Sequence, residues 1–391
     1  MKKKFFKNAL FIGAFTALMM LVVACQPQTV EVVKEVEVTR VVTETETVVE
    51  EVEVVKEVEV EVVKEVEVEK IVEVEVAPSN GQNSLIISTA STGGTYYPVG
   101  VALSTLTNVK LGNSGIQMNA ISSAGSGENV QLLKNKEADL AILQGLFGAM
   151  AWQGKGRYEG APEQEMRSIT MLWENVEHIV VDAEYAATGN ISDLDTLKGE
   201  AFSIGKRGSG TETSGTVILN ALGYDIDNDF VPERVGYSES SAALQDGRIA
   251  GMNTPAGPPV SAVTQAFATL GSDEISLLEF TEEQIEQVNS EFPVWSRYVI
   301  PAGTYPGLDV DINTIAQPNF LAVHPDLDEE TVYQITKNIY ENLDFLVNIH
   351  KATGAMSLER AIVGLPVPLH PGAVRYYEEM GIEVPAELIG D

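Results

Sequence analysis

Short apolar runs alternate with amphipathic stretches over most of the chain after residue 84. The runs have the length of β-strands, and in the stretches between them apolar residues recur with the spacing of helices. The predicted strands are Leu85–Ala90, Ile116–Ile121, Leu140–Gln144, Ile179–Val181, Ala201–Gly205, Val231–Tyr237 and Ile249–Asn253. The predicted helices are Val99–Leu106, Glu128–Lys136, Thr211–Leu222, Ser240–Gln245 and a long one across Asp328–Leu346. This alternation predicts an α/β fold with parallel sheets, whose ligands bind at the carboxyl ends of the strands.

The first 25 residues have the pattern of a bacterial lipoprotein signal peptide. Lysines precede an apolar stretch, 9–23, that is too short for an ordinary membrane span. Cys25 follows Ala24 as in a lipobox, and it is the only cysteine of the chain, which excludes an internal disulfide. We expect acylated Cys25 to anchor an extracytoplasmic protein to the outer face of the cell membrane. A plain secretory signal with an incidental cysteine is the alternative.

A low-complexity Val/Glu stalk and linker are predicted for residues 26–83. Residues 26–76 carry sixteen Glu against five Lys or Arg, and a near-repeat of VVKEVEV occurs at 32–38, 54–60 and 62–68. A charged, β-branched segment without aromatic residues cannot form a core of its own, which favours a spacer. The alternative is an oligomerising coiled coil or β-assembly, although the Val-Val doublets keep no heptad spacing.

Net charge excludes some partners of the folded part. The chain carries a formal charge of −32; without the four lysines of the signal and the net −11 of the stalk, −25 remains. Such acidity argues against nucleic acid and against docking on anionic lipid. It also repels anionic solutes at long range, so an anion site has to rely on local backbone dipoles in a partly desolvated cleft.

Three Gly/Ser-rich loops lie where a predicted strand gives way to a predicted helix: 91–98 (STGGTYYP), 124–129 (AGSGEN) and 205–212 (GKRGSGTE). A helix start presents unpaired N–H groups and the positive end of its dipole, and glycine lets a ligand approach them closely. We therefore expect the three loops together to bind a small anionic molecule. The candidate ligand-binding residues are Gly93, Gly94, Thr95, Tyr96, Ser126, Gln144, Arg207, Ser209, Gly210 and Thr211.

Several residues near these loops allow a structural role as well. Lys206 and Arg207 form either a carboxylate grip or a solvated loop edge. Gln144 ends a buried strand, so its amide either contacts the ligand or caps a helix, and Asn129 is equally open. Glu128 and Glu212 are better suited to helix starts than to an anion site. The segment 255–258 (PAGP) either lines the cleft mouth or only ends a strand.

Enzymatic chemistry has little support in the sequence. The four histidines show no metal-ligand spacing, and the only cysteine is committed to lipid. Gly208-Ser209-Gly210 lacks the pattern of a nucleophile elbow, and Gly205–Gly210 lacks the ending of a phosphate-binding Walker loop. We expect a binding protein without catalytic residues, cofactor or metal.

Seven segments are specific enough to compare with a known family; in chain order they are STGGTYYPVG (91–100), GSGEN (125–129), ADLAILQ (138–144), GSGTE (208–212), QDGRIAG (245–251), IPAGTYPG (300–307) and HPGAVRYY (370–377). Together they resemble the solute receptors of tripartite ATP-independent periplasmic (TRAP) transporters of the TAXI type. The resemblance covers nearly all of residues 84–381, and the stalk lies outside it. It departs from the family at Lys206-Arg207, where small residues or proline are more usual, and at Gly125–Asn129, where many relatives carry a bulkier residue.

The resemblance implies a two-lobed periplasmic-binding-protein-like (Venus flytrap) fold with a hinge, in a solute-binding domain of residues 84–391. The first lobe is expected to take about 84–176 and 300–391, and the second about 177–299. It also implies capture of glutamate, 2-oxoglutarate or a similar small organic anion for TRAP membrane permease subunits driven by an ion gradient. A ligand-sensing lipoprotein of the same fold that serves a signalling partner is the alternative, and an adhesion role would rest on the stalk alone.

Overall fold

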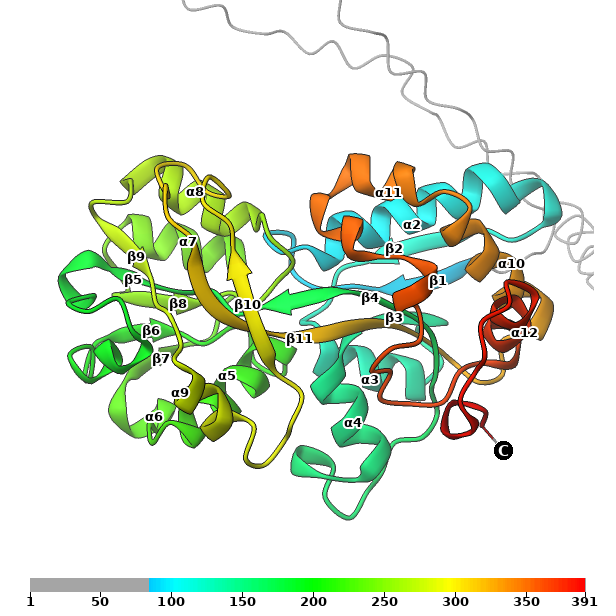
Figure 1. Cartoon of the computed structure of the whole chain (residues 1–391), viewed down its shortest axis with the longest axis horizontal. Coiled ribbons are helices and arrows are strands. Elements are labelled where there is room, and N and C mark those ends of the chain that lie inside the picture. Colours follow the sequence, from blue (N-terminus) through cyan, green and yellow to red (C-terminus); the bar gives the residue numbers. More distant parts are fainter. Residues whose placement is uncertain (1–83, 391) are drawn as a thin grey trace, which may run out of the picture. The chain divides into compact units, whose positions relative to one another are not determined.

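The computed structural model describes residues 84–390, so the expectations for the signal peptide, Cys25 and the stalk lie outside the described residues. The described part contains two β-sheets, each flanked by helices (Figure 1). We call the elements around the six-stranded sheet the first lobe and those around the five-stranded sheet the second lobe. Within 84–390, none of the helices combines the length and the apolar character needed to cross a membrane.

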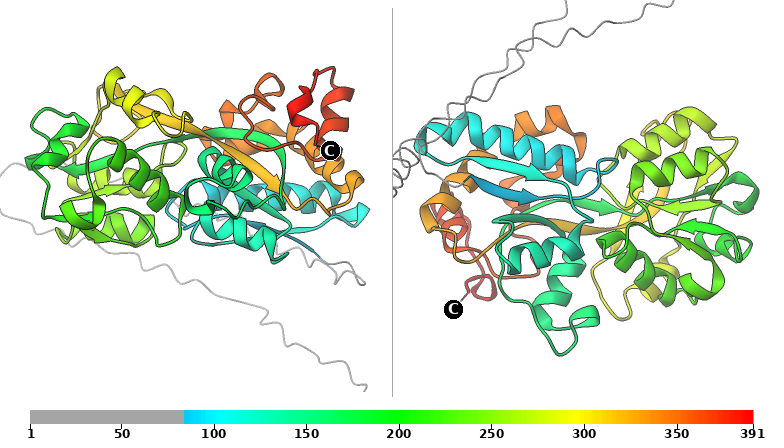
Figure 2. Two further views of the ribbon diagram at one scale, coloured as in Figure 1. Left: turned by 90° about the horizontal axis from the view of Figure 1, so that it is seen from below. Right: turned by 180° about the vertical axis from the view of Figure 1, so that it is seen from behind.

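The sheet of the first lobe has the strand order β10-β11-β3-β1-β2, with β4 paired to β11. Its strands are β1 (Leu85–Ser88), β2 (Met118–Ile121), β3 (Leu140–Gln144), β4 (Arg167–Val176), β10 (Ser296–Ile300) and β11 (Ile312–Val323). β1 runs parallel to β2 and β3, whereas the long β11 is antiparallel to β3, β4 and β10. α2 (Tyr96–Leu111) and α11 (Leu343–Ile349) lie over one face of this sheet, and α3 (Ser126–Lys134) and α4 (Gly145–Gln153) over the other (Figure 2).

The sheet of the second lobe has the order β7-β6-β8-β5-β9. Its strands are β5 (Ile179–Asp182), β6 (Ala201–Ser203), β7 (Val231–Glu233), β8 (Gly251–Asn253) and β9 (Ile275–Leu277). The helices that flank it are α5 (Gly210–Ala221), α6 (Ile226–Asp229), α7 (Tyr237–Gln245), α8 (Ser261–Leu270) and α9 (Glu282–Val288). The chain passes from the first sheet to the second at Glu177 and His178, between β4 and β5. The expected lobe boundaries stay a prediction.

Two features of the sequence pattern were misjudged. The sheets are mixed rather than wholly parallel, because β11 enters the first sheet antiparallel and β5 enters the second antiparallel to β8 and β9. The helix expected across Asp328–Leu346 is two helices, α10 (Glu329–Tyr340) and α11. The chain leaves the helical conformation at Asn342, whose side-chain amide bonds to the backbone oxygen of Asn338 instead.

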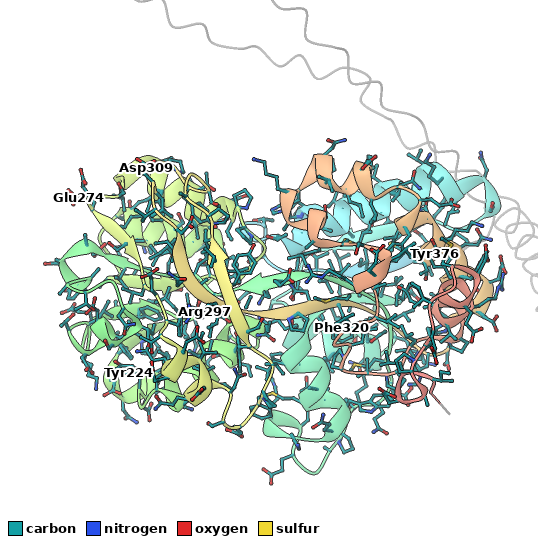
Figure 3. The ribbon with its side chains drawn as sticks, in the orientation of Figure 1. Tyr224, Glu274, Arg297, Asp309, Phe320 and Tyr376 are labelled. Atoms are coloured by element: carbon teal, nitrogen blue, oxygen red, sulfur yellow. The ribbon has the colours of Figure 1, made fainter. Side chains whose placement is uncertain are left out.

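The buried apolar side chains form two clusters, and the larger of them contains residues of both lobes. In the first lobe the core includes Phe320 of β11, which lies in the middle of the sheet (Figure 3). α10 packs there against α12 (Pro371–Glu379), where Tyr340 stacks on Tyr376. In the second lobe Tyr224 packs against Phe230. These cores hold the sheets whose strand ends form the site.

Candidate functional site

The cavity lies between the two lobes and is lined by the Gly/Ser-rich loops. It encloses about 30 Å³, room for about two water molecules. Eight of the ten candidate residues line it, namely Gly94, Thr95, Tyr96, Ser126, Gln144, Ser209, Gly210 and Thr211. The other lining residues are Ala90, Ser91, Ala124, Gly125, Asn175, Lys206, Gly236, Tyr237, Pro255 and Ala256.

Five helices begin at this cavity. The lining residues at their starts are Thr95 and Tyr96 (α2), Gly125 and Ser126 (α3), Gln144 (α4), Ser209, Gly210 and Thr211 (α5), and Gly236 and Tyr237 (α7). Three of these helices belong to the first lobe and two to the second. The first N–H groups of a helix have no partner within the helix and carry the positive end of its dipole. The cavity is therefore surrounded by partial positive charge from backbone groups.

The lobes touch through glycines beside the cavity. A Cβ on Gly127 of the first lobe would lie 2.2 Å from the backbone oxygen of Gly208 in the second. A Cβ on Gly210 would lie 2.6 Å from Oε1 of Gln144. Neither glycine has a positive φ, so the close approach of the lobes, and not the backbone conformation, requires them. The structure is thus a closed arrangement of the two lobes.

Gly93 contributes to this lobe contact and does not line the cavity. A Cβ there would lie 2.7 Å from the backbone nitrogen of Ser238, and the Gly93 oxygen accepts a hydrogen bond from the Ala262 N–H. Next to it, the hydroxyl of Thr95 donates to the backbone oxygen of Gly257 across the lobes at 2.7 Å. Because Gly93 lies outside the cavity lining, its position does not support direct contact with the ligand, and that contact stays a prediction.

Second-lobe hydroxyls at the cavity are bonded to their own lobe. Tyr237 donates to the Pro255 oxygen at 2.6 Å, and Thr211 bonds to the Tyr237 hydroxyl at 2.8 Å. The Ser209 hydroxyl oxygen caps α5 by accepting from the Glu212 N–H at 2.9 Å. Burial raises the pKa of Tyr237 far above its usual range, so its hydroxyl keeps its proton.

First-lobe side chains at the cavity are less completely paired. Tyr96 donates to Oδ1 of Asn319 at 2.5 Å, and the Ser126 hydroxyl accepts from the Gln144 N–H at 3.0 Å. Burial raises the pKa of Tyr96 far above its usual range. In contrast, Oε1 of Gln144 and Nδ2 of Asn175 are buried in the described structure without a hydrogen-bond partner.

Charged side chains play a small part in the lining. Lys206 lines the cavity, whereas its neighbour Arg207 is exposed and does not. Glu212 points away into an ion pair with Arg234 at 2.7 Å and accepts from the Gly208 N–H. Glu128 accepts from the Ala124 N–H at 2.5 Å. Both glutamates therefore support helix starts, as expected, and no carboxylate is among the cavity-lining residues of the described chain.

Asn129 belongs to the scaffold. Its side chain is buried and bonds to the Ser123 hydroxyl and to the backbone oxygens of Thr89 and Ile142. These bonds tie α3 to the residue after β1 and to the middle of β3, next to two of the Gly/Ser-rich loops. The structural alternative for Asn129 is the one that the structure supports.

Sequence reasoning missed two important lining residues. Tyr237 was expected at the end of a strand, but β7 ends at Glu233 and Tyr237 is the first residue of α7 after Gly236. The glycine followed by a hydroxyl side chain was the available signal. Asn175 lies in β4, an element that the pattern of short runs did not predict, and no local motif marks it.

A family model and several solved structures match the chain. The model of the NMT1-like family matches residues 87–381. MatC from Rhodopseudomonas palustris with bound malate shares 14% identity at a TM-score of 0.49, over 75% of this chain and 98% of that one. PhnD1 from Prochlorococcus marinus in complex with methylphosphonate shares 14% identity at a TM-score of 0.46, over 76% of this chain and 98% of that one. The periplasmic aliphatic sulphonate binding protein SsuA from Escherichia coli shares 12% at 0.40, over 78% and 95%. The expected fold class, a two-lobed α/β periplasmic-binding-protein-like fold, is confirmed.

Proposed function

The chain belongs to the NMT1-like family, and we propose that it is an extracytoplasmic receptor that captures a small organic anion between its two lobes. The observation that carries the proposal is the convergence of five helix N-termini on one cavity. Oriented N–H groups stabilise an anion where water is excluded, and they need few basic side chains to do so. The single lysine and the missing carboxylates of the described lining agree with this chemistry.

Capture depends on lobe movement. A cavity of about 30 Å³ is too small for a molecule such as glutamate or 2-oxoglutarate. The lobes therefore have to separate to admit the solute and then close until the glycine contacts at Gly127 and Gly210 re-form as far as the solute allows. The N–H groups of both lobes reach the anion only in the closed form, so closure and binding stabilise each other.

We further propose that the receptor serves a TRAP transporter of the TAXI type. The support is the resemblance of the sequence segments, three of which form the starts of α2, α3 and α5 at the cavity. In this proposal acylated Cys25 holds the protein on the outer face of the cell membrane, and the closed form delivers glutamate, 2-oxoglutarate or a similar anion to ion-driven permease subunits.

Ligand binding is tested with the full chain, unfolded and refolded to remove any solute that it carries. Thermal unfolding is then followed with acidic amino acids, dicarboxylates and matched neutral compounds. A solute that binds only the native state raises the melting temperature with its concentration. We expect a shift with at least one organic anion. A shift with neutral compounds alone, or with none of the compounds tested, contradicts the proposal.

The transporter class needs a separate experiment. Uptake of the bound solute is measured in cells that contain the receptor and its permease, with either the ion gradient collapsed by an ionophore or ATP depleted while the gradient is maintained. The TRAP proposal predicts that only collapse of the gradient stops uptake. Dependence on ATP contradicts that part and leaves the anion receptor intact.

A further inference from the structure

Four amide side chains share one face of the first sheet at the cavity. β11 pairs with β4 so that Gln317 lies opposite Asn175, and with β3 so that Asn319 lies opposite Gln144. Residues directly opposite each other, and residues two apart on one strand, point to the same face of a sheet. Gln144, Asn175, Gln317 and Asn319, which we call the amide floor, are all at most 3% exposed.

The amide floor divides into a paired and an unpaired part. Both polar atoms of the Asn319 side chain have hydrogen-bond partners, because Oδ1 accepts from the Tyr96 hydroxyl and Nδ2 donates to the Trp173 oxygen. Gln317 accepts from the Leu146 N–H at the start of α4, but its Nε2 has no partner. Oε1 of Gln144 and Nδ2 of Asn175 also have none, and these two residues line the cavity.

Unpaired buried amide groups are uncommon in proteins, because nearly all buried polar atoms find a partner. Here one residue with an unpaired acceptor and one residue with an unpaired donor line the same cavity. A hydroxyl group satisfies both, since it donates to Gln144 Oε1 and accepts from Asn175 Nδ2. A methylene leaves both unpaired.

An ammonium group fits this floor poorly. It accepts no hydrogen bond, so it cannot pair with Asn175 Nδ2, and it needs a nearby anion to offset its desolvation. No carboxylate lines the described cavity. Glu177 directly follows β4, does not line the cavity, and has a pKa that burial raises to about 8, which favours its neutral form at pH 7.

We propose that Gln144 and Asn175, supported by Gln317, form a specificity subsite for a hydroxyl group next to the anionic group of the solute, so that the receptor prefers 2-hydroxy acids to the matching unsubstituted and 2-amino acids. The inference rests on the proposed anion receptor and names its solute class. The helix N-termini hold the carboxylate, and the amide floor recognises its substituent.

The test is calorimetric titration of the refolded full chain with two matched series: succinate, malate and aspartate, and glutarate, 2-hydroxyglutarate and glutamate. In at least one series we expect the hydroxy acid to bind about tenfold more tightly than the unsubstituted acid, as one added pair of hydrogen bonds allows, and more tightly than the amino acid. Equal affinity of hydroxy and unsubstituted acids, or tightest binding of the amino acid, overturns the inference while the anion receptor stands. Failure of all six acids and of every other organic anion contradicts the receptor itself.

Variants separate recognition from folding. Asn175→Leu and Gln144→Met are close in size to the native residues, and we expect them to remove the preference for the hydroxyl while the unsubstituted acid still binds. The control is Asn338→Leu in α10, which removes another buried amide with an unpaired Nδ2 that does not line the cavity; it should leave the preference intact. Asn175→Asp adds a carboxylate to the lining and should weaken the binding of the hydroxy and unsubstituted acids more than that of the amino acid, whose ammonium group can pair with it. An unchanged preference in Asn175→Leu overturns the inference.

Discussion

The first and second lobes both present helix N-termini to the cavity, but their side chains differ in how many hydrogen bonds they have already made. On the second-lobe side Thr211 is bonded to Tyr237, and Tyr237 to the Pro255 oxygen. On the first-lobe side Gln144 and Asn175 keep an unpaired acceptor and an unpaired donor. The second lobe thus contributes a wall of the cavity whose Thr211 and Tyr237 hydroxyls are already bonded within that lobe, whereas the first lobe contributes two groups that still need a partner.

This difference assigns separate tasks to the two lobes. Groups that need a partner discriminate between solutes, because a solute that fails to pair with them leaves a buried polar group unsatisfied. A wall whose hydroxyls are already bonded supplies mainly backbone N–H groups and shape. We therefore expect the first lobe to recognise the solute and the second lobe to complete the anion site by closing on it.

The largest effect is expected where the lobes meet. In Gly127→Ala the added methyl group overlaps the Gly208 oxygen, so the second lobe cannot close fully on the solute. Overpacking of this kind costs about 1–3 kcal/mol, which corresponds to roughly a 5- to 150-fold loss of affinity for the anion found by the thermal shift assay. Calorimetric titration measures the loss.

Gly112→Ala is the matched control for this variant. Gly112 follows α2 with a φ of −55° and has no atom within 4 Å of the position of an added Cβ. It should bind like the wild type, and both variants should keep the wild-type melting temperature without solute to within a few degrees. Undiminished affinity in Gly127→Ala would mean that binding does not need the closed form seen here.

A second effect concerns Glu177, which lies where the chain passes between the lobes and is 1% exposed. Burial raises its pKa from 4.5 to about 8, although a hydrogen bond from Trp295 acts in the other direction. Between these values the folded protein keeps a proton that the unfolded chain has lost. Glu177 therefore lowers the free energy of unfolding as pH rises through this window, by up to about 1.4 kcal/mol per pH unit.

Glu177→Gln removes this titration. The free energy of unfolding of the variant should gain on that of the wild type steadily from pH 5 to pH 8, as measured by urea unfolding at each pH. His178 is present in both proteins, and burial lowers its pKa to about 4, so it affects both alike at the acid end. A difference between the two proteins that does not change with pH would show that Glu177 is ionised in the folded state.

A smaller effect, on the free energy of unfolding, is expected from Ser209→Ala in the second lobe. The Ser209 hydroxyl oxygen caps α5, and loss of such a cap lowers the free energy of unfolding by about 1 kcal/mol. Ser209→Asn retains a capping oxygen and should unfold like the wild type in urea. If the alanine variant loses affinity for the anion without losing stability, the Ser209 hydroxyl contacts the solute. That result would contradict the view that the second-lobe hydroxyls are bonded only within their own lobe.

The smallest effect, on the affinity for the anion, is expected from the neighbouring side chains of Lys206 and Arg207. Lys206 lines the cavity and Arg207 does not, so Lys206→Gln should weaken anion binding about threefold and Arg207→Gln should leave it unchanged. Interactions of exposed charges amount to about 0–1 kcal/mol and weaken with salt. The titrations are therefore made at low ionic strength. A larger loss in Arg207→Gln would restore the arginine to the site.

Much of the fold was predictable because its local signals are strong. β3 has the predicted bounds, and β1, β2, β5, β6 and β8 lie within or beside their predicted runs. The longest strands, β4 and β11, were missed, because polar residues such as Asn175 and Gln317 interrupt their apolar pattern. Because these polar residues are buried, the two strands lack the apolar pattern from which strands are predicted.

The site divides in the same way. The glycine- and hydroxyl-rich helix starts were recognisable from the sequence, and most of the candidate residues line the cavity. Asn175 and the amide floor were not, since their proximity arises from the pairing of β11 with β3 and β4, strands far apart in the chain. Arg207 has the right chemistry for an anion but lies outside the cavity. Local motifs indicate backbone sites, and only tertiary structure shows which side chains complete them.

The most direct test of an anion site between the lobes compares Ser209→Asp with Ser209→Asn. The two side chains have nearly the same size and both cap a helix, but only aspartate adds a negative charge to the cavity lining. The full chain is refolded and titrated calorimetrically with the anion that gave the largest thermal shift. The account predicts one bound anion per chain for Ser209→Asn and no measurable binding for Ser209→Asp at equal stability. Equal affinity in the two variants would contradict it.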